Sequence, residues 1–407
     1  MLAMLVLCAA GTLAAQPGSL TLKEMIAQML VVNVDGFSYR GPLAVHPAFM
    51  EMAGKLQVGG VIPHYGNTDP EKIRATNRAL EALTQLPLLV CADGVDLRGA
   101  PGQEAARFGD RYIGGFIGRY KKLSDGDFRA LAALNAFTLA AIGVNTLLGP
   151  TVDDSTGDPR TAERAEALLE ELEWFGIQPV IKHFPFLPQG ADLHLESPDT
   201  RVPAEEMEKR TAVFRPLAQA SPFLMTTHLL DSLVSRDLVT FSPQWRQILN
   251  RETGFKGLVM SDALLMLSHY RDVSILGEQG PRRGGEGNGT DPARLAQWAA
   301  KAIMAGHDLL IVEGNPEVTY SLVDSLLAAA QAQDGSALRK RIEESAARVV
   351  AFKEAHRAVL TRQVDAGLES IRTSAALALR AMYSSEPRLD GGALFTLRAA
   401  FQKAAAK

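Results

Sequence analysis

The chain alternates short apolar runs with longer segments of helical periodicity, and this alternation occurs eight times between residues 29 and 331. The apolar runs are rich in valine, isoleucine and leucine and are nearly continuous, as strands buried on both faces of a parallel sheet require. The predicted strands are 29–37, 59–66, 87–94, 143–150, 177–184, 223–230, 257–264 and 307–314. The pattern therefore predicts eight strands, each followed by helix.

The segments between the apolar runs carry helix start and stop signals. Aspartate–proline pairs open the segments 69–85, 158–176 and 291–306, and the last of these ends on Gly306. Eight strand–helix units predict an α/β fold, a (β/α)8 TIM-type barrel, with a doubly wound open sheet as the structural alternative. After the helical segment 338–360 strands no longer occur. We therefore expect a barrel domain at 20–356 and a short helical C-terminal extension at 357–407.

The first residues form an apolar segment that is too short to span a bilayer and that ends in small residues at 14 and 15. This pattern predicts a signal peptide over 1–15, cleaved near Gln16, and export to the periplasm or the extracellular space. No basic residue precedes the apolar run, so an uncleaved segment and a cytoplasmic protein remain the alternative. Cys8 is a poor lipoprotein site, because the bulky Leu7 precedes it where a small residue is expected.

Composition and charge limit the kinds of partner that we expect this protein to bind. Among 407 residues, 47% are hydrophobic and 22% charged, which is ordinary for a globular protein. The 42 basic and 46 acidic residues leave a net charge of −4, and no basic run indicates nucleic-acid binding. We expect no stable membrane span and a monomer, with a dimer as the alternative. Removal of the signal would leave Cys91 alone, so we expect no internal disulfide.

Polar side chains follow the predicted strands at the end where a barrel carries its chemistry. These residues are Asp93, Asp153, Lys182, His183, His228 and Asp262. Each has an ordinary structural explanation when taken alone, such as a turn or a helix cap. Together they indicate a shared ligand site, because an apolar strand that ends in a charged group costs burial energy unless that group is paired or solvated.

Three chemistries fit these residue types. Paired acid and base groups serve glycoside hydrolysis, in which one group attacks the anomeric carbon and the other protonates the departing oxygen. Lys182 at a strand end would instead serve an aldolase. His183, Asp192 and His194 could be metal ligands, but the chain has no H-E-x-x-H helix and no cysteine–histidine cluster at zinc spacing. We therefore expect no metal and no cofactor.

Four segments carry a family likeness. The stretch "VIKHFPFLPQGADLHLESPD" at 180–199 resembles the K-H-F-P-G-H-G…D-S-H segment of glycoside hydrolase family 3, in its bacterial β-N-acetylhexosaminidase branch. The segment 240–266 resembles the family sequence that leads to S-D-D-L-x-M. The segments 57–63 and 143–153 resemble its second and fourth strands. The likeness covers residues 20–356.

The resemblance implies a retaining hydrolase acting on a terminal β-linked N-acetylglucosamine. By position, Asp262 would be the nucleophile, and His194, oriented by Asp192, the general acid/base. The spacing of Asp192 and His194 places both on one side of an extended backbone. The implied substrate-binding residues are Asp93, Lys182, His183, His228, Asp153 and Met266.

The sequence departs from the family pattern in three places. The loop "FLPQG" lacks the histidine of G-H-G, "DGVDLRG" at 93–99 replaces D-Q-E-G-G, and "DDSTGDPR" at 153–160 lacks the arginine of R-S-F-G, with only Arg160 nearby. Arg282 and Arg283, in a glycine-rich loop, are candidate replacements. The alternatives are therefore a relative with changed sugar specificity, a phosphorolytic relative, or a non-catalytic sugar-binding protein.

Overall fold

The structure is a computed structural model that describes residues 20–34, 43–97, 106–109, 123–153, 160–188, 193, 196–269, 291–364, 398–399 and 401–402. Several predicted features lie outside the described residues. These are the signal segment 1–15, Asp192, His194, Arg282 and Arg283.

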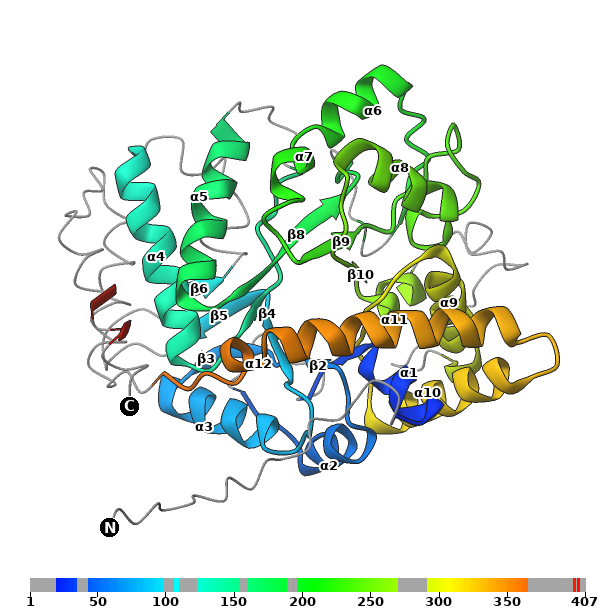
Figure 1. The fold of residues 1–407 in the computed structure, drawn as a ribbon, viewed down its shortest axis with the longest axis horizontal. Coiled ribbons are helices and arrows are strands. Elements are labelled where there is room, and N and C mark those ends of the chain that lie inside the picture. The colour runs from blue at the N-terminus through cyan, green and yellow to red at the C-terminus, as the bar shows by residue number, and fades with distance from the viewer. Residues whose placement is uncertain are drawn as a thin grey trace, which may run out of the picture.

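Eight strands form one sheet in which every neighbouring pair is parallel. They are β1 (Leu30–Val32), β2 (Gly60–Val61), β4 (Leu89–Ala92), β7 (Thr146–Leu147), β8 (Gln178–Phe184), β9 (Phe223–Thr226), β10 (Leu258–Ser261) and β11 (Leu310–Val312). Their order around the sheet follows the chain, and a parallel bridge between Met260 and Leu309 joins the last two strands. The sheet thus closes into the predicted barrel, and the open-sheet alternative is wrong (Figure 1).

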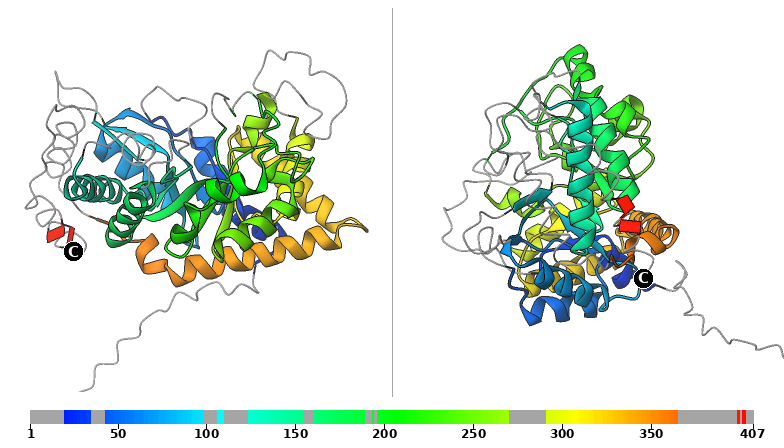
Figure 2. Two further views of the ribbon diagram at one scale, coloured as in Figure 1. Left: turned by 90° about the horizontal axis from the view of Figure 1, so that it is seen from above. Right: turned by 90° about the vertical axis from the view of Figure 1, so that its left-hand side faces the viewer.

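Helices follow the strands in turn and surround the sheet (Figures 1 and 2). They are α2 (Pro47–Leu56), α3 (Pro70–Glu81), α4 (Asp125–Ala141), α5 (Arg160–Phe175), α6 (Ala204–Thr211), α7 (Phe214–Leu217), α8 (Pro243–Thr253), α9 (Pro292–Ala305) and α10 (Pro316–Gln331). Local chemistry sets their ends. Asp69 caps α3 by accepting a hydrogen bond from the Glu71 backbone N–H, and Gly306 ends α9 with φ of 110°.

A second, smaller sheet was not anticipated. It joins β3 (Tyr65–Thr68), β5 (Gly94–Leu97) and β6 (Ala106–Gly109), and its β5–β6 pair is antiparallel. The predicted strand 59–66 runs across two elements, β2 and the start of β3. Pro63 separates them, because a proline has no N–H with which to continue a strand ladder.

The barrel interior is a layer of alternate strand residues. Val31, Leu89, Cys91, Val180, Phe223, Met225, Leu258, Met260, Leu309 and Ile311 share one buried cluster. The residues between them, such as Leu30, Val90 and Val259, belong instead to the clusters packed under the helices. This is the two-residue alternation expected of strands buried on both faces. The alternation therefore identifies the residues of each strand that face the barrel axis.

One end of the barrel is covered by α11 (Ser336–Ala355) and α12 (Arg357–Leu360), which cross the molecule after the last strand (Figures 1 and 2). Their contacts are with residues that precede strands. Lys353 donates to Gln28 before β1, and Asn145 before β7 donates to the Leu360 carbonyl. Phe352 packs edge-on against Phe223, the first residue of β9. The helices therefore close the N-terminal end of the barrel.

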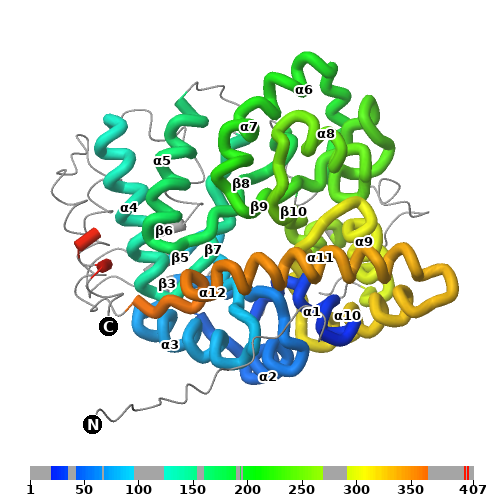
Figure 3. Tube along the Cα trace, viewed as in Figure 1, coloured from blue at the N-terminus to red at the C-terminus, as the bar shows by residue number. Residues whose placement is uncertain are grey.

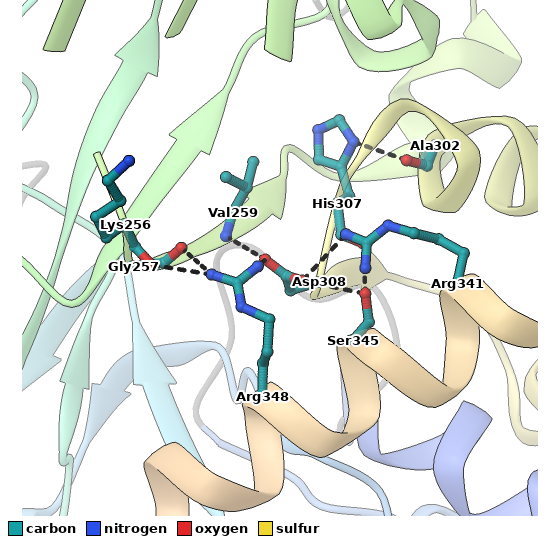
Figure 4. A network of polar contacts seen from close by, with 9 residues as sticks. All are labelled: Lys256, Gly257, Val259, Ala302, His307, Asp308, Arg341, Ser345 and Arg348. Atoms are coloured by element: carbon teal, nitrogen blue, oxygen red, sulfur yellow. Dashed lines mark hydrogen bonds and ion pairs between the residues drawn. The ribbon is translucent and has the colours of Figure 1, made fainter. Parts of the chain in front are cut away.

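A buried carboxylate joins α11 to the sheet (Figure 4). Asp308 is fully buried and accepts hydrogen bonds from Arg348 at 2.7 Å, Ser345 at 3.0 Å and Arg341 at 3.2 Å. Asp308 also accepts a hydrogen bond from the backbone N–H of Val259 in β10, at 3.0 Å. Arg348 also donates to the carbonyls of Lys256 and Gly257 just before β10. The carboxylate is thus fully satisfied by two arginines, a hydroxyl and the backbone.

We expect Asp308→Asn to lower the free energy of unfolding by about 2 to 3 kcal/mol, because two arginines lose their shared counter-charge in a largely dry site. Urea titration measures this. The matched control is Asp324→Asn on α10, whose side chain is 61% exposed and pairs with Lys23 at the surface. The control should change stability by less than about 1 kcal/mol. Equal midpoints for the two variants would contradict a structural role for the Asp308 network.

Part of the C-terminal extension lies against the barrel's own helices (Figure 3). Arg398 pairs with the buried carboxylate of Glu171 on α5 at 2.8 Å. Phe401 packs against Trp174 and Phe175 of the same helix, with ring centroids 5.6 and 4.9 Å away. Arg398 and Phe401 therefore dock on α5. Within the described residues, no helix combines the length and apolar character needed to cross a bilayer.

Candidate active site

The C-terminal ends of the strands present a polar layer directly above the apolar interior. Each member follows an interior residue by two positions, so it points to the barrel axis. The members are Asn33, His64, Asp93, Lys182, Thr227, Asp262 and Glu313, after Val31, Ile62, Cys91, Val180, Met225, Met260 and Ile311. Seven of the eight barrel strands therefore direct a polar side chain to the barrel axis at the C-terminal end of the sheet.

Two of the predicted sugar-binding residues contact each other. Lys182 Nζ lies 2.5 Å from Asp93 Oδ1. The lysine side chain is nearly buried, whereas 38% of the aspartate side chain is exposed. The ammonium thus has its counter-charge within the protein, and the carboxylate reaches the open side of the layer. The pair presents both a donor and an acceptor to a ligand.

Asp153 and His183 form a second pair. The segment after β7 continues beside β8, with hydrogen bonds from Lys182 N–H to the Pro150 carbonyl at 3.1 Å and from Val152 N–H to the Lys182 carbonyl at 2.8 Å. This ladder brings the fully buried Asp153 carboxylate to 3.3 Å from His183 Nδ1. The Lys182–His183 and Phe184–Pro185 peptide bonds in this region are cis.

The charge around His183 comes from three neighbours. Burial lowers the pKa of its imidazole, but the carboxylate of Asp153, helped by that of Asp262, outweighs burial and the repulsion from Lys182. The net pKa of His183 is therefore raised. Lys182 and Asp262 thus both act electrostatically on His183, although Asp262 lies far from it in the sequence.

Asp262 follows β10 directly and is partly buried. Its backbone N–H donates to the Thr226 carbonyl at 3.2 Å, and its Oδ1 accepts a hydrogen bond from the Ala263 backbone N–H at 2.7 Å. Among the described residues, no cation is paired with this carboxylate. One oxygen is therefore oriented by the backbone, while the group stays at the rim of the layer and can meet a ligand.

His228 contacts Ala263, the residue after Asp262, and is fully buried. Its Nε2 is 3.0 Å from the Ala263 carbonyl, to which it donates, and its Nδ1 is 2.6 Å from the Thr240 hydroxyl. Both ring nitrogens thus contact the protein, and the ring supports the backbone that follows Asp262. A direct contact between His228 and substrate remains a prediction.

Met266 and Leu193 are buried in the same cluster as the barrel interior. Met266 belongs to the short helix η5 (Leu264–His269), which follows Asp262. Leu193 is the residue between Asp192 and His194 in the chain, and it is only 6% exposed. The roles predicted for Met266 and for the Asp192–His194 dyad stay predictions.

Sequence reasoning missed Asn33, His64, Thr227 and Glu313. The signal was present, because all four occupy the alternate positions that continue an interior face. The two-residue register from the apolar interior positions identifies all four, whereas charge at the end of a predicted strand does not. Within the described part of the chain, no three metal-ligating side chains are grouped to hold a metal ion.

A closed parallel barrel with carboxylates, a lysine and an imidazole at the C-terminal ends of its strands defines an enzyme of the (β/α)8 class. Residues 21–352 match the model described as the glycosyl hydrolase family 3 N-terminal domain. The chain belongs to glycosyl hydrolase family 3. It is therefore a glycoside hydrolase, and its substrate is a glycan.

Similar proteins agree with this family. A β-hexosaminidase of Nitrosomonas eutropha is 28% identical over 297 residues, which cover 66% of this chain and 77% of the relative. A β-hexosaminidase of Vibrio cholerae serotype O1 is 27% identical over 320 residues, covering 70% of this chain and 86% of the relative.

Solved structures share the fold. A β-N-acetylhexosaminidase from Beutenbergia cavernae has a TM-score of 0.64 at 21% identity, covering 83% of this chain and 99% of its own. A family 3 β-N-acetylglucosaminidase from Paenibacillus sp. has a TM-score of 0.62 at 22% identity, covering 95% and 69%.

Proposed function

We propose that this glycoside hydrolase is a retaining exo-β-N-acetylhexosaminidase that releases terminal β-linked N-acetylglucosamine from cell-wall or chitin-type fragments. The observation that carries the proposal is the Asp262 carboxylate, which follows β10 at the barrel axis, is oriented by the Ala263 N–H and has no cationic partner among the described residues. The names of the relatives, β-hexosaminidases, support the choice of sugar.

In the proposed reaction Asp262 attacks the anomeric carbon. A carbon–oxygen bond to the carboxylate forms as the bond to the leaving oxygen breaks, and His194 gives its proton to that oxygen. Water then attacks the same carbon, His194 takes one of its protons, and the glycosyl–aspartate ester is cleaved. Two displacements at one carbon retain its configuration.

The remaining residues hold the sugar in this proposal. Asp93 and Lys182 would bind hydroxyls, because their pair offers an acceptor and donors at the axis. His183 would contact a hydroxyl through the nitrogen opposite Asp153, whose carboxylate orients the ring and raises the pKa of the imidazole. In this proposal these groups would surround the position at which Asp262 meets the anomeric carbon.

The Asp192–His194 dyad is proposed as the acid/base. Its support is Leu193, the residue between the two, which belongs to the same buried cluster as Met266 and the residues of the barrel interior. A carboxylate beside an imidazole sets its tautomer and raises its basicity, which suits a group that first donates and then accepts a proton.

The test is hydrolysis of 4-nitrophenyl β-N-acetylglucosaminide, followed by proton NMR of the first product. We expect turnover, with the β anomer of N-acetylglucosamine appearing before mutarotation. The corresponding β-glucoside should react more slowly. First appearance of the α anomer would contradict a retaining mechanism, and absence of turnover with every aryl glycoside would favour the non-catalytic alternative. Formation of sugar 1-phosphate in phosphate buffer would instead indicate phosphorolysis.

A further inference from the structure

We propose that Glu313, oriented by His64 and Asn33, binds a hydroxyl group of the sugar and sets the sugar specificity of the enzyme. The three residues follow β11, β2 and β1, which lie side by side in the sheet. The inference rests on the proposed function, because it assigns a further contact to the same substrate site.

Register places Glu313 at the axis. Leu309 and Ile311 belong to the interior cluster, and Leu310 and Val312 pack under the helices, so the next interior position is 313. The same step leads from Met260 to Asp262 on the neighbouring strand β10. The hydrogen bond from Ser261 N–H to the Leu309 carbonyl, at 2.9 Å, fixes the two strands against each other. Glu313 and the proposed nucleophile therefore belong to one polar layer.

The surroundings of Glu313 hold it in place. His64 Nε2 lies 3.7 Å from Glu313 Oε1, across the end of β1. Asn33, the residue after β1, accepts a hydrogen bond from the Gly314 N–H at 2.8 Å and so fixes the backbone next to Glu313. His64 and Asn33 are positioning residues in this arrangement. A carboxylate held by its neighbours loses little freedom when it binds a ligand.

A carboxylate is a costly residue at this level of the barrel, where an apolar side chain would be buried at a lower cost in free energy. The Glu313 side chain is 8% exposed and that of His64 13%, so both keep a small open surface. Carboxylates accept strong hydrogen bonds from hydroxyls, which is the chemistry that distinguishes one sugar from another.

The arrangement divides the layer into two arcs. Asp93, Lys182 and His183 come from β4 and β8, whereas Glu313 and His64 come from the adjoining part of the ring, β11 and β2. A pyranose at the axis would meet acceptors and donors from both arcs. Glu313 and His64 would then contact hydroxyl groups of the sugar that the first arc does not contact.

The experiment measures sugar affinity by calorimetry and needs no turnover. N-acetylglucosamine and its 3-, 4- and 6-deoxy derivatives are titrated into wild type and Glu313→Gln. We expect the variant to bind N-acetylglucosamine about 10- to 100-fold more weakly, as for one lost charge-assisted hydrogen bond. For one deoxy derivative, which lacks the contacted hydroxyl, wild type and variant should bind equally. His64→Gln should give a smaller loss with the same derivative.

The control is Glu317→Gln, four residues further on and exposed in the first turn of α10, which should leave all affinities unchanged. An equal loss with all derivatives, unchanged affinity in Glu313→Gln, or no sugar binding by wild type would overturn the inference. A rate loss in Glu313→Gln that grows with the pKa of the leaving group would overturn it too, because Glu313 would then be the proton donor. If wild type binds the sugars with the expected pattern but hydrolyses no glycoside, the proposed function fails and this inference stands.

Discussion

Replacing Asp262 with asparagine is expected to lower kcat for a β-N-acetylglucosaminide on the order of 10³-fold or more, because an amide cannot form the glycosyl ester. The fold should be unaffected. The Oδ1 atom of asparagine can accept the hydrogen bond that Ala263 N–H now donates to the carboxylate, so the segment after β10 keeps its anchor. Steady-state kinetics measures the loss, and urea unfolding checks the fold.

A second variant makes the assignment of the nucleophile specific. Asp262→Ala leaves space at the anomeric carbon, and azide added to this variant is expected to attack there and release the α-glycosyl azide. Only the residue that approaches the anomeric carbon from that face produces this product. Asp324→Asn, at the surface of α10, serves as the neutral control. Turnover by Asp262→Asn at the wild-type rate, or azide rescue with a β product, would remove Asp262 from the nucleophile's role.

The second large effect concerns stability. Lys353 on α11 is fully buried against the end of the barrel, where its ammonium donates to Gln28 Oε1 at 2.8 Å. Burial lowers the pKa of Lys353 to about 7, from about 10.5 in the unfolded chain. Between these two values the unfolded chain binds a proton that the folded protein does not. Stability should therefore rise with pH in that window, by up to about 1.4 kcal/mol per pH unit.

We expect wild type to gain unfolding free energy between pH 7 and pH 9, and Lys353→Met to lack this gain. The window stops at pH 9 because burial raises the pKa of the Cys91 thiol to about 12, and this group acts with the opposite sign at higher pH. Below pH 7 the methionine variant should be more stable than wild type, by up to a few kcal/mol. Part of that advantage is offset, because Gln28 Oε1 loses its donor.

The matched control is Lys340→Met on the same helix, where the side chain is 79% exposed. This variant should show the wild-type pH dependence. Urea titrations at four pH values provide the comparison. A Lys353→Met protein whose stability rises with pH in parallel with wild type would show that Lys353 stays protonated in the folded state.

The barrel was predictable because its signal is local and repeated. Eight apolar runs and the aspartate–proline helix starts each follow from a few neighbouring residues, and strand order follows once parallel strands are joined by helices. The small sheet β3–β5–β6 was missed for the converse reason. Its strands are four residues each and lie in the loops after β2 and β4, so they depend on contacts between those loops.

The candidate site was predicted in part. Asp93, Lys182 and Asp262 were found from their places at strand ends, and the structure directs all three to the axis. That Lys182 pairs with Asp93, and that Asp153 lies beside His183, depends on the register of β7 against β8, which no single segment contains. His64 and Glu313 are 249 positions apart in the chain and meet only because β1 lies between their strands.

The amino-acid sequence by itself determined the class of fold, the family and the chemical types available at the strand ends, since these follow from local patterning and short motifs. Only the tertiary structure decided which charges neutralise one another, that His228 is buried with both nitrogens engaged, and that Glu313 joins the layer of Asp262. The physical reason is the separation along the chain of the residues that interact. Side-chain alternation and helix capping act over a few residues, whereas an ion pair requires two atoms within about 4 Å, and closure of the barrel alone brings them there.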